Sequence, residues 1–213
     1  GDVDAVEVSP DRMKRAAPLA ALTLAALALR VLPWLANLPL HHDEALYGTW
    51  ARAIADGSDP LLLTPWVDKP PLVLYLLALA IRTTGVSELS LRLPGMLASL
   101  LTVPATYVLA RRLYGSGPGW AAAVLVALSP FAILFAPTAF TDGWLTLSVT
   151  LAAAASRRPG WAGVLVGLAA ASKQQGVLFT PLVLALVLAS VGPRTGILSG
   201  ATEGSAVEGR RLS

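Results

Sequence analysis

Long apolar runs separated by short polar segments are the feature that most constrains the fold of this chain. The runs occupy residues 16–39, 89–110, 120–140, 143–156, 161–171 and 177–190. A helix needs about 20 apolar residues to cross the hydrocarbon core of a bilayer. Because unpaired backbone groups are costly in lipid, such runs are expected to be helical. The sequence therefore predicts an all-α fold, a polytopic transmembrane helix bundle over residues 16–190, with Pro130 and Pro137 kinking the third run.

The composition excludes several other classes of protein. The chain is 55% hydrophobic and only 14% charged, with a mean hydropathy of +0.65, which is unusual for a soluble domain. It contains no cysteine, which excludes disulfide bonds and thiolate metal sites. The net charge of +3 is modest and spread along the chain, so no nucleic-acid partner is expected.

The two ends of the chain differ from the apolar module. Residues 1–15 are predicted to be a cytoplasmic tail, in which Met13 precedes two basic residues and the first apolar run. A signal peptide over residues 13–38 is the alternative. That apolar run is longer than a typical signal sequence, and no small-residue cleavage site precedes His41, so a retained anchor is favoured. Residues 191–213 are rich in Gly and Ser and are predicted to be disordered.

Basic residues predict the topology. If Lys14 and Arg15 are cytoplasmic, the first span exits and the polar segment 40–69 is extracytoplasmic. The following apolar run, residues 70–84, is too short to cross and is expected to lie in the interface. Both arginine pairs, at residues 111–112 and 157–158, then fall on the cytoplasmic side. The same solution places six ionisable residues on the outer side: Asp43, Glu44, Asp68, Lys69, Asp142 and Lys173.

The first outer segment begins with an amphipathic helix. Leu46, Trp50, Ala53 and Ile54 form its apolar stripe, which predicts a helix lying flat on membrane lipids. Asp43 stands in its first turn. Asp43 is either an N-cap, with Glu44 compensating the helix dipole, or a residue with a chemical role, and the local pattern leaves both open. Asp142 has the same two interpretations at the next outer loop, while His41 and His42 are expected to be loop residues rather than metal ligands.

Two lysines have positions suited to an anion. Lys69 precedes Pro70 and Pro71, which favour the start of a helix, so its charge lies near a helix N-terminus at the membrane surface. The alternative is a lysine that merely extends its amine to the interface. Lys173 lies between two apolar segments, and an ionisable residue there is a candidate functional residue.

Five segments in order resemble a known membrane module. They are "HHDEALYGTWARAIADG", "DKPPLVLYLLALAIRTTGVSELSLRLPGML", "YVLARRLYG", "TDGWLTL" and "GLAAASKQQG". Together, over residues 14–190, they resemble the N-terminal part of the C-type glycosyltransferases, and most closely the protein O-mannosyltransferase and lipid A aminoarabinose transferase group. The resemblance implies a polyprenyl-phosphate sugar donor, a lipid, protein or glycan acceptor, and an active site on the outer face of the plasma (inner) membrane.

The resemblance also assigns roles to residues. The acidic pair of the first outer loop corresponds to Asp43 and Glu44, and the acid of the second outer loop to Asp142. These three are the candidate catalytic residues, with Asp43 as the general base for an acceptor hydroxyl and inversion at the anomeric carbon. Lys69 corresponds to a lysine associated with the donor phosphate, and Lys173 is a second candidate phosphate ligand. A requirement for a divalent cation is left open, and its candidate ligands are Asp43, Asp68 and Asp142.

Two other functions remain as alternatives. Family members usually continue with further spans, so a truncated, non-catalytic membrane fragment or scaffold of the family is the first alternative. In "SKQQG" the chain also differs from the Lys-Gly-Pro form found in many members. A small transporter is the second, but it would favour acids within the spans and an internal repeat, and neither is evident.

Overall fold

The structure, a computed structural model, describes residues 10–36 and 39–191, with side chains described from Ala16 onward. Within these ranges it is all-helical, which confirms the predicted fold class. The elements are α1 (Pro10–Leu35), α2 (His42–Asp56), α3 (Pro71–Thr84), α4 (Glu88–Tyr114), α5 (Ser116–Leu128), α6 (Pro130–Leu134), α7 (Asp142–Ala154), α8 (Pro159–Ser172), the 3₁₀ helix η1 (Gln174–Phe179) and α9 (Thr180–Val191). The predicted tails lie largely outside the described residues.

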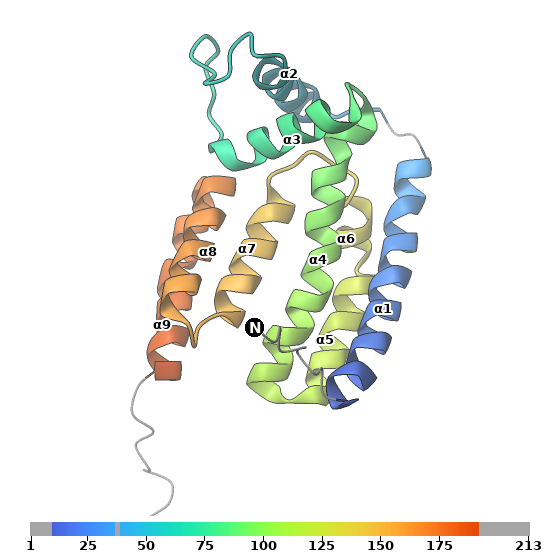
Figure 1. Cartoon of the computed structure of the whole chain (residues 1–213), viewed down its shortest axis with the longest axis vertical. Coiled ribbons are helices and arrows are strands. Elements are labelled where there is room, and N and C mark those ends of the chain that lie inside the picture. The colour runs from blue at the N-terminus through green and yellow to red at the C-terminus, as the bar shows by residue number, and fades with distance from the viewer. Residues whose placement is uncertain (1–9, 37–38, 192–213) are drawn as a thin grey trace, which may run out of the picture.

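The helices form an upright bundle that is covered at one end. Helices α1, α4, α5, α7, α8 and α9 run roughly along the long axis, whereas α2 and α3 lie across one end (Figure 1). The 14-residue α3 begins with Pro70 as N-cap and Pro71 as its first residue, as the double proline predicted. The placement of α3 agrees with the expectation that residues 70–84 do not cross the membrane.

Within the described part of the chain, three helical segments are long and apolar enough to cross a membrane: Ala16–Leu35, Glu88–Tyr114 and Gln174–Val191. Helices α3, α5 and α8 are shorter apolar helices. Large apolar side chains remain exposed on the outside of the bundle, such as Leu125 (72% exposed) and Leu178 (75%). The chain is therefore a multi-pass membrane protein. The helix of the first span ends at Leu35, earlier than the predicted boundary at residue 39.

The predicted span over residues 120–140 is not a continuous helix. Helix α5 ends at Leu128, α6 ends at Leu134, and the chain is not α-helical from Phe135 to Thr141. The break falls at Pro130, which has no N–H to donate and therefore cannot continue the hydrogen-bond ladder. Arg30 of α1, which is completely buried, donates to the carbonyls of Val126 and Ala127 at the end of α5. The arginine thus satisfies carbonyls that the helix break leaves without partners.

Small residues allow the upright helices to approach closely. Helix α4 packs against both α5 and α7, and Ala98, Ala123 and Ala152 in these helices are fully buried. Such contacts are typical of helix packing in membranes, where dispersion replaces the hydrophobic effect between helices.

The apolar face of α2 differs from the predicted stripe. Tyr47, Trp50, Ala51 and Ile54 are buried against α3 and the segment before α7, while Leu46 is 44% exposed. Trp50 is only 6% exposed, so it packs within the protein and does not face lipid. The prediction of an amphipathic helix is confirmed, but its partner is protein rather than the bilayer. The sequence pattern alone does not distinguish these two partners.

Candidate functional site

A cavity of about 870 Å³ opens where α2 and α3 cover the bundle. Four charged residues line it: Asp43, Lys69, Asp142 and Lys173. From there it continues along α4 from Gly95 to Thr106, which corresponds to roughly 16 Å at the helical rise per residue. The lining is mainly apolar apart from these charges and several hydroxyl groups. The structure therefore brings together acids and lysines that are distant in the sequence, at one end of a long cavity.

The N-terminus of α2 is fixed by His41 and Glu44. His41 is the N-cap, and its Nδ1 accepts a hydrogen bond from the backbone N–H of Asp43 at 3.2 Å. Glu44 completes the capping box because its Oε2 accepts from the backbone N–H of His41 at 2.9 Å. The N-cap interpretation of Asp43 is therefore wrong, and Asp43 instead lines the cavity.

Glu44 is buried behind this surface. Its side chain is 3% exposed, and its Oε1 accepts from the backbone N–H of Ala139 at 3.0 Å. One carboxylate thus joins the start of α2 to the segment that leads into α7. Glu44 does not line the cavity, in contrast to Asp43 and Asp142.

Lys69 lies beside an acid and an aromatic ring. Its Nζ contacts a carboxylate oxygen of Asp68 and lies 5.9 Å from the centroid of the Tyr47 ring. The hydrogen bond between Lys69 and Asp68 lowers the pKa of Asp68 and raises the pKa of Lys69. Both groups therefore stay charged across the neutral range.

Lys173 forms the second ion pair of the cavity. Its Nζ lies 2.6 Å from Oδ1 of Asp142, across a sequence separation of 31 residues. Asp142 is in the first turn of α7, whose N-cap is Thr141, so the carboxylate of Asp142 is not the cap. Gln174, which follows Lys173 in the sequence, donates a hydrogen bond from Nε2 to the backbone carbonyl of Asp68. The α8–η1 junction is thereby tied to the segment that carries Lys69.

Sequence reasoning missed Tyr47 and Gln174. Tyr47 lines the cavity although it is only 5% exposed. Burial raises the pKa of Tyr47, and the charges of Asp43, Asp68 and Asp142 raise it further, while Lys69 opposes them. Tyr47 follows Asp43 by four residues, which places both on one face of a helix, and this spacing could have identified it.

The structure brings together a different set of possible metal ligands from the predicted one. Asp68 and Asp142 each bind a lysine. Among the described residues, the side chains whose donor atoms meet within 4.8 Å are His41, His42 and Asp43. His42 is the first residue of α2 and His41 caps that helix, so neither histidine is an ordinary loop residue.

The fold and the cavity define a class of protein, a multi-pass membrane protein with a charged site at one end of its helix bundle. A family model described as dolichyl-phosphate-mannose-protein mannosyltransferase matches residues 68–201, more than half of the chain. The chain belongs to this family of membrane glycosyltransferases. No curated protein and no solved structure gives a significant match. The matched region contains Lys69, Asp142 and Lys173, whereas Asp43 and Glu44 precede it.

Proposed function

We propose that this protein transfers a sugar from a polyprenyl-phosphate donor to an acceptor hydroxyl on the extracytoplasmic face of the plasma membrane. The observation that carries the proposal is the meeting of Asp43, Asp142, Lys69 and Lys173 on one cavity that continues into the bundle. The cavity has a charged end and a mainly apolar remainder. The donor matches it, because it carries a charged headgroup on a long apolar chain. The acceptor is a hydroxyl of a lipid, a protein or a glycan.

The two lysines are the proposed ligands of the donor phosphate. The side chains of Lys69 and Lys173 are 24% and 26% exposed, while their acidic partners Asp68 and Asp142 are 55% and 63% exposed. A phosphate at the charged end of the cavity competes with these carboxylates for the amines. Beyond the charges, Val126, Phe131 and Phe135 line the cavity and give the first isoprene units an apolar surface.

Asp43 is the proposed general base. Its carboxylate takes the proton of the acceptor hydroxyl as that oxygen attacks the anomeric carbon. The bond between this carbon and the phosphate oxygen breaks, and the bonding electrons leave with the polyprenyl phosphate. Lys69 and Lys173 stabilise the charge that develops on the leaving phosphate. Attack opposite to the leaving group inverts the anomeric centre.

The other two acids have supporting roles in this mechanism. Asp142 holds Lys173 in the cavity and orients the sugar. Glu44 is a positioning residue, because its carboxylate connects the start of α2 to the backbone of Ala139. Replacement of Glu44 is therefore expected to reduce folding and transfer together.

Sugar transfer by Asp43→Asn tests the base. The amide keeps the size of the side chain and cannot accept the proton, so transfer in proteoliposomes should fall 10²–10⁴-fold, roughly 3–5 kcal/mol of barrier. Binding of the donor should persist. Asp56→Asn is the matched control, because it makes the same substitution at an exposed residue at the other end of α2. This variant should retain full transfer.

Transfer by Asp43→Asn within a few-fold of wild type would contradict the assignment of the base. A wild-type protein that binds the donor and transfers no sugar would instead favour the non-catalytic scaffold.

A further inference from the structure

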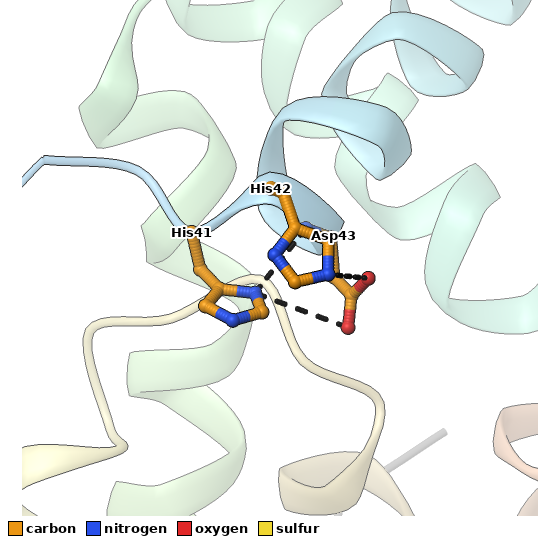
Figure 2. A group of neighbouring side chains, drawn as sticks. All are labelled: His41, His42 and Asp43. Atoms are coloured by element: carbon orange, nitrogen blue, oxygen red, sulfur yellow. Dashed lines mark hydrogen bonds and ion pairs between the residues drawn. The ribbon is translucent and has the colours of Figure 1, made fainter.

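We propose that His41, His42 and Asp43 bind a divalent transition-metal ion of the zinc class at the rim of the cavity. The two imidazoles and the carboxylate converge at the start of α2 (Figure 2). The binding itself is argued from these residues alone, whereas any role of the ion in sugar transfer rests on the proposed function.

The distances suit a compact site. Nε2 of His42 lies 3.2 Å from Oδ1 of Asp43, and Nδ1 of His41 lies 3.9 Å from Oδ2. Ligands about 2.1 Å from a tetrahedral zinc ion are roughly 3.4 Å apart, so both separations are close to those required. The three donor atoms lie within 4.8 Å of one another. The side chain of His42 is 82% exposed and can close the remaining gap by rotating.

The donor atoms have the right chemistry. Imidazole nitrogens together with a carboxylate oxygen suit zinc and its neighbours better than magnesium or calcium, which prefer oxygen ligands. Nδ1 of His41 accepts the N–H of Asp43, so this nitrogen carries a lone pair. Metal binding would replace that hydrogen bond of the helix cap.

The charges of the cavity favour an additional cation. Two acids and two lysines line the cavity, and Asp68, which pairs with Lys69 beside it, adds one further formal negative charge. A phosphate donor adds further negative charge at the same end. A divalent ion beside Asp43 would offset this excess.

The proposed ion has three protein ligands, so a fourth position is open. Catalytic zinc sites share this arrangement, in which the ion lowers the pKa of a bound oxygen acid. Asp43 lines the cavity and the two histidines lie outside its lining, so the ion would sit at the rim, beside the proposed place of the acceptor hydroxyl. The ion would then lower the pKa of that hydroxyl, and the carboxylate oxygen of Asp43 that does not bind the ion would accept the proton.

Direct metal binding tests the proposal without any transfer assay. The protein, purified without a polyhistidine tag, is titrated with Zn²⁺ against a chromophoric competitor, and with Co²⁺ to record its visible absorption. We expect one ion per chain and the intense visible bands of a tetrahedral Co²⁺ site. His42→Ala should weaken Zn²⁺ binding at least 10-fold.

His41→Asn provides the sharpest variant. Asparagine is a good N-cap, so α2 should keep its start while the imidazole ligand is lost. We expect Zn²⁺ binding at least 10-fold weaker with an unchanged unfolding temperature, whereas Asp56→Asn should bind as wild type. Equal Zn²⁺ binding by wild type and by the two histidine variants would overturn the proposal. His42 would then be only a neighbour of Asp43, with its Nε2 3.2 Å from Oδ1 of that carboxylate.

Discussion

At the scale of single residues, Lys69 and Asp68 hold each other in their charged forms. Their hydrogen bond raises the pKa of Lys69 from its ordinary 10.5 and lowers that of Asp68 from 3.8. The stability that the folded protein gains from charged Lys69 is fully present below the ordinary pKa of this lysine. It is lost as the pH rises through the raised pKa. The stability gained from charged Asp68 is present above the ordinary pKa of this carboxyl group. It is lost as the pH falls through the lowered pKa. The ion pair therefore persists between about pH 3.8 and 10.5.

Chemical modification of Lys69 tests this pair. Acylation requires the neutral amine, so Asp68→Asn, which removes the charged partner, should let Lys69 react several-fold faster at pH 9. The extent of acylation at each lysine can be read by peptide mass spectrometry. Lys173, which pairs with Asp142 instead, is the internal control and should react equally in both proteins. Equal reactivity of Lys69 in the two proteins would show that Asp68 does not control its pKa.

The residues at the start of α2 show why the sequence left the role of Asp43 open. Both Asp and His can cap a helix, and the choice depends on the geometry before the first turn. Here Nδ1 of His41 makes the cap, and burial of Glu44 follows from its bond to Ala139, a residue 95 positions away. The sequence predicted that both acids belong to the site. Only the contact of Glu44 with a distant segment shows that Glu44 has a structural role, while Asp43 lines the cavity.

At the scale of elements, α4 provides a close contact that fixes the segment before α7. A Cβ atom at Gly95 would lie 2.1 Å from the backbone carbonyl oxygen of Thr138. No flexible side chain could yield, because the neighbouring atom is backbone. Gly95 thus lets the segment leading to Asp142 lie against α4 at the cavity.

Gly95→Ala should therefore destabilise the protein by about 1–3 kcal/mol, the usual cost of overpacking. Gly163→Ala is the matched control, since a Cβ at Gly163 meets no atom within 4 Å. That change should be neutral or gain up to about 1 kcal/mol from helix propensity. Thermal unfolding in detergent checks both variants. Similar unfolding temperatures for Gly95→Ala and wild type would mean that this contact is not close in solution.

The elements also show what the sequence could predict. The position of α3 was predicted from its length, and the two prolines predicted its start. The region 120–140 was predicted less well, since Pro130 ends α5 instead of kinking a continuous span. The carbonyls at the end of α5 accept hydrogen bonds from Arg30, which belongs to another helix, α1. That partner cannot be recognised from a local pattern.

At the scale of the whole molecule, the bundle has two distinct ends. The loop between α2 and α3 and the start of α7 lie at the covered end, and the α4–α5 junction lies at the other (Figure 1). Arg111 and Arg112 lie in the last turn of α4, and Arg157 and Arg158 follow α7. Both helices run away from the covered end (Figure 1). By the positive-inside rule, we expect the covered end to face the extracytoplasmic side. The cavity itself could not be outlined from sequence, because its walls come from five separate stretches of chain.

Cysteine labelling tests this orientation. The chain has no natural cysteine, so Ser58→Cys and Ser116→Cys each provide one exposed thiol. In intact cells an impermeant maleimide should label the first and not the second, and permeabilisation should expose both. Labelling of Ser116→Cys alone in intact cells would reverse the topology.

The central claim is that one cavity holds the donor phosphate between Lys69 and Lys173. The most direct measurement is the binding of radiolabelled polyprenyl-phosphate mannose to the reconstituted protein. Polyprenyl phosphate should compete and polyprenol should not. Lys69→Met and Lys173→Met should each weaken binding about 10-fold, the loss of one charged contact of roughly 1.4 kcal/mol. Arg82→Met, which removes an exposed cation from the end of α3 outside the cavity lining, should bind as wild type. Wild-type affinity in both lysine variants would contradict the account.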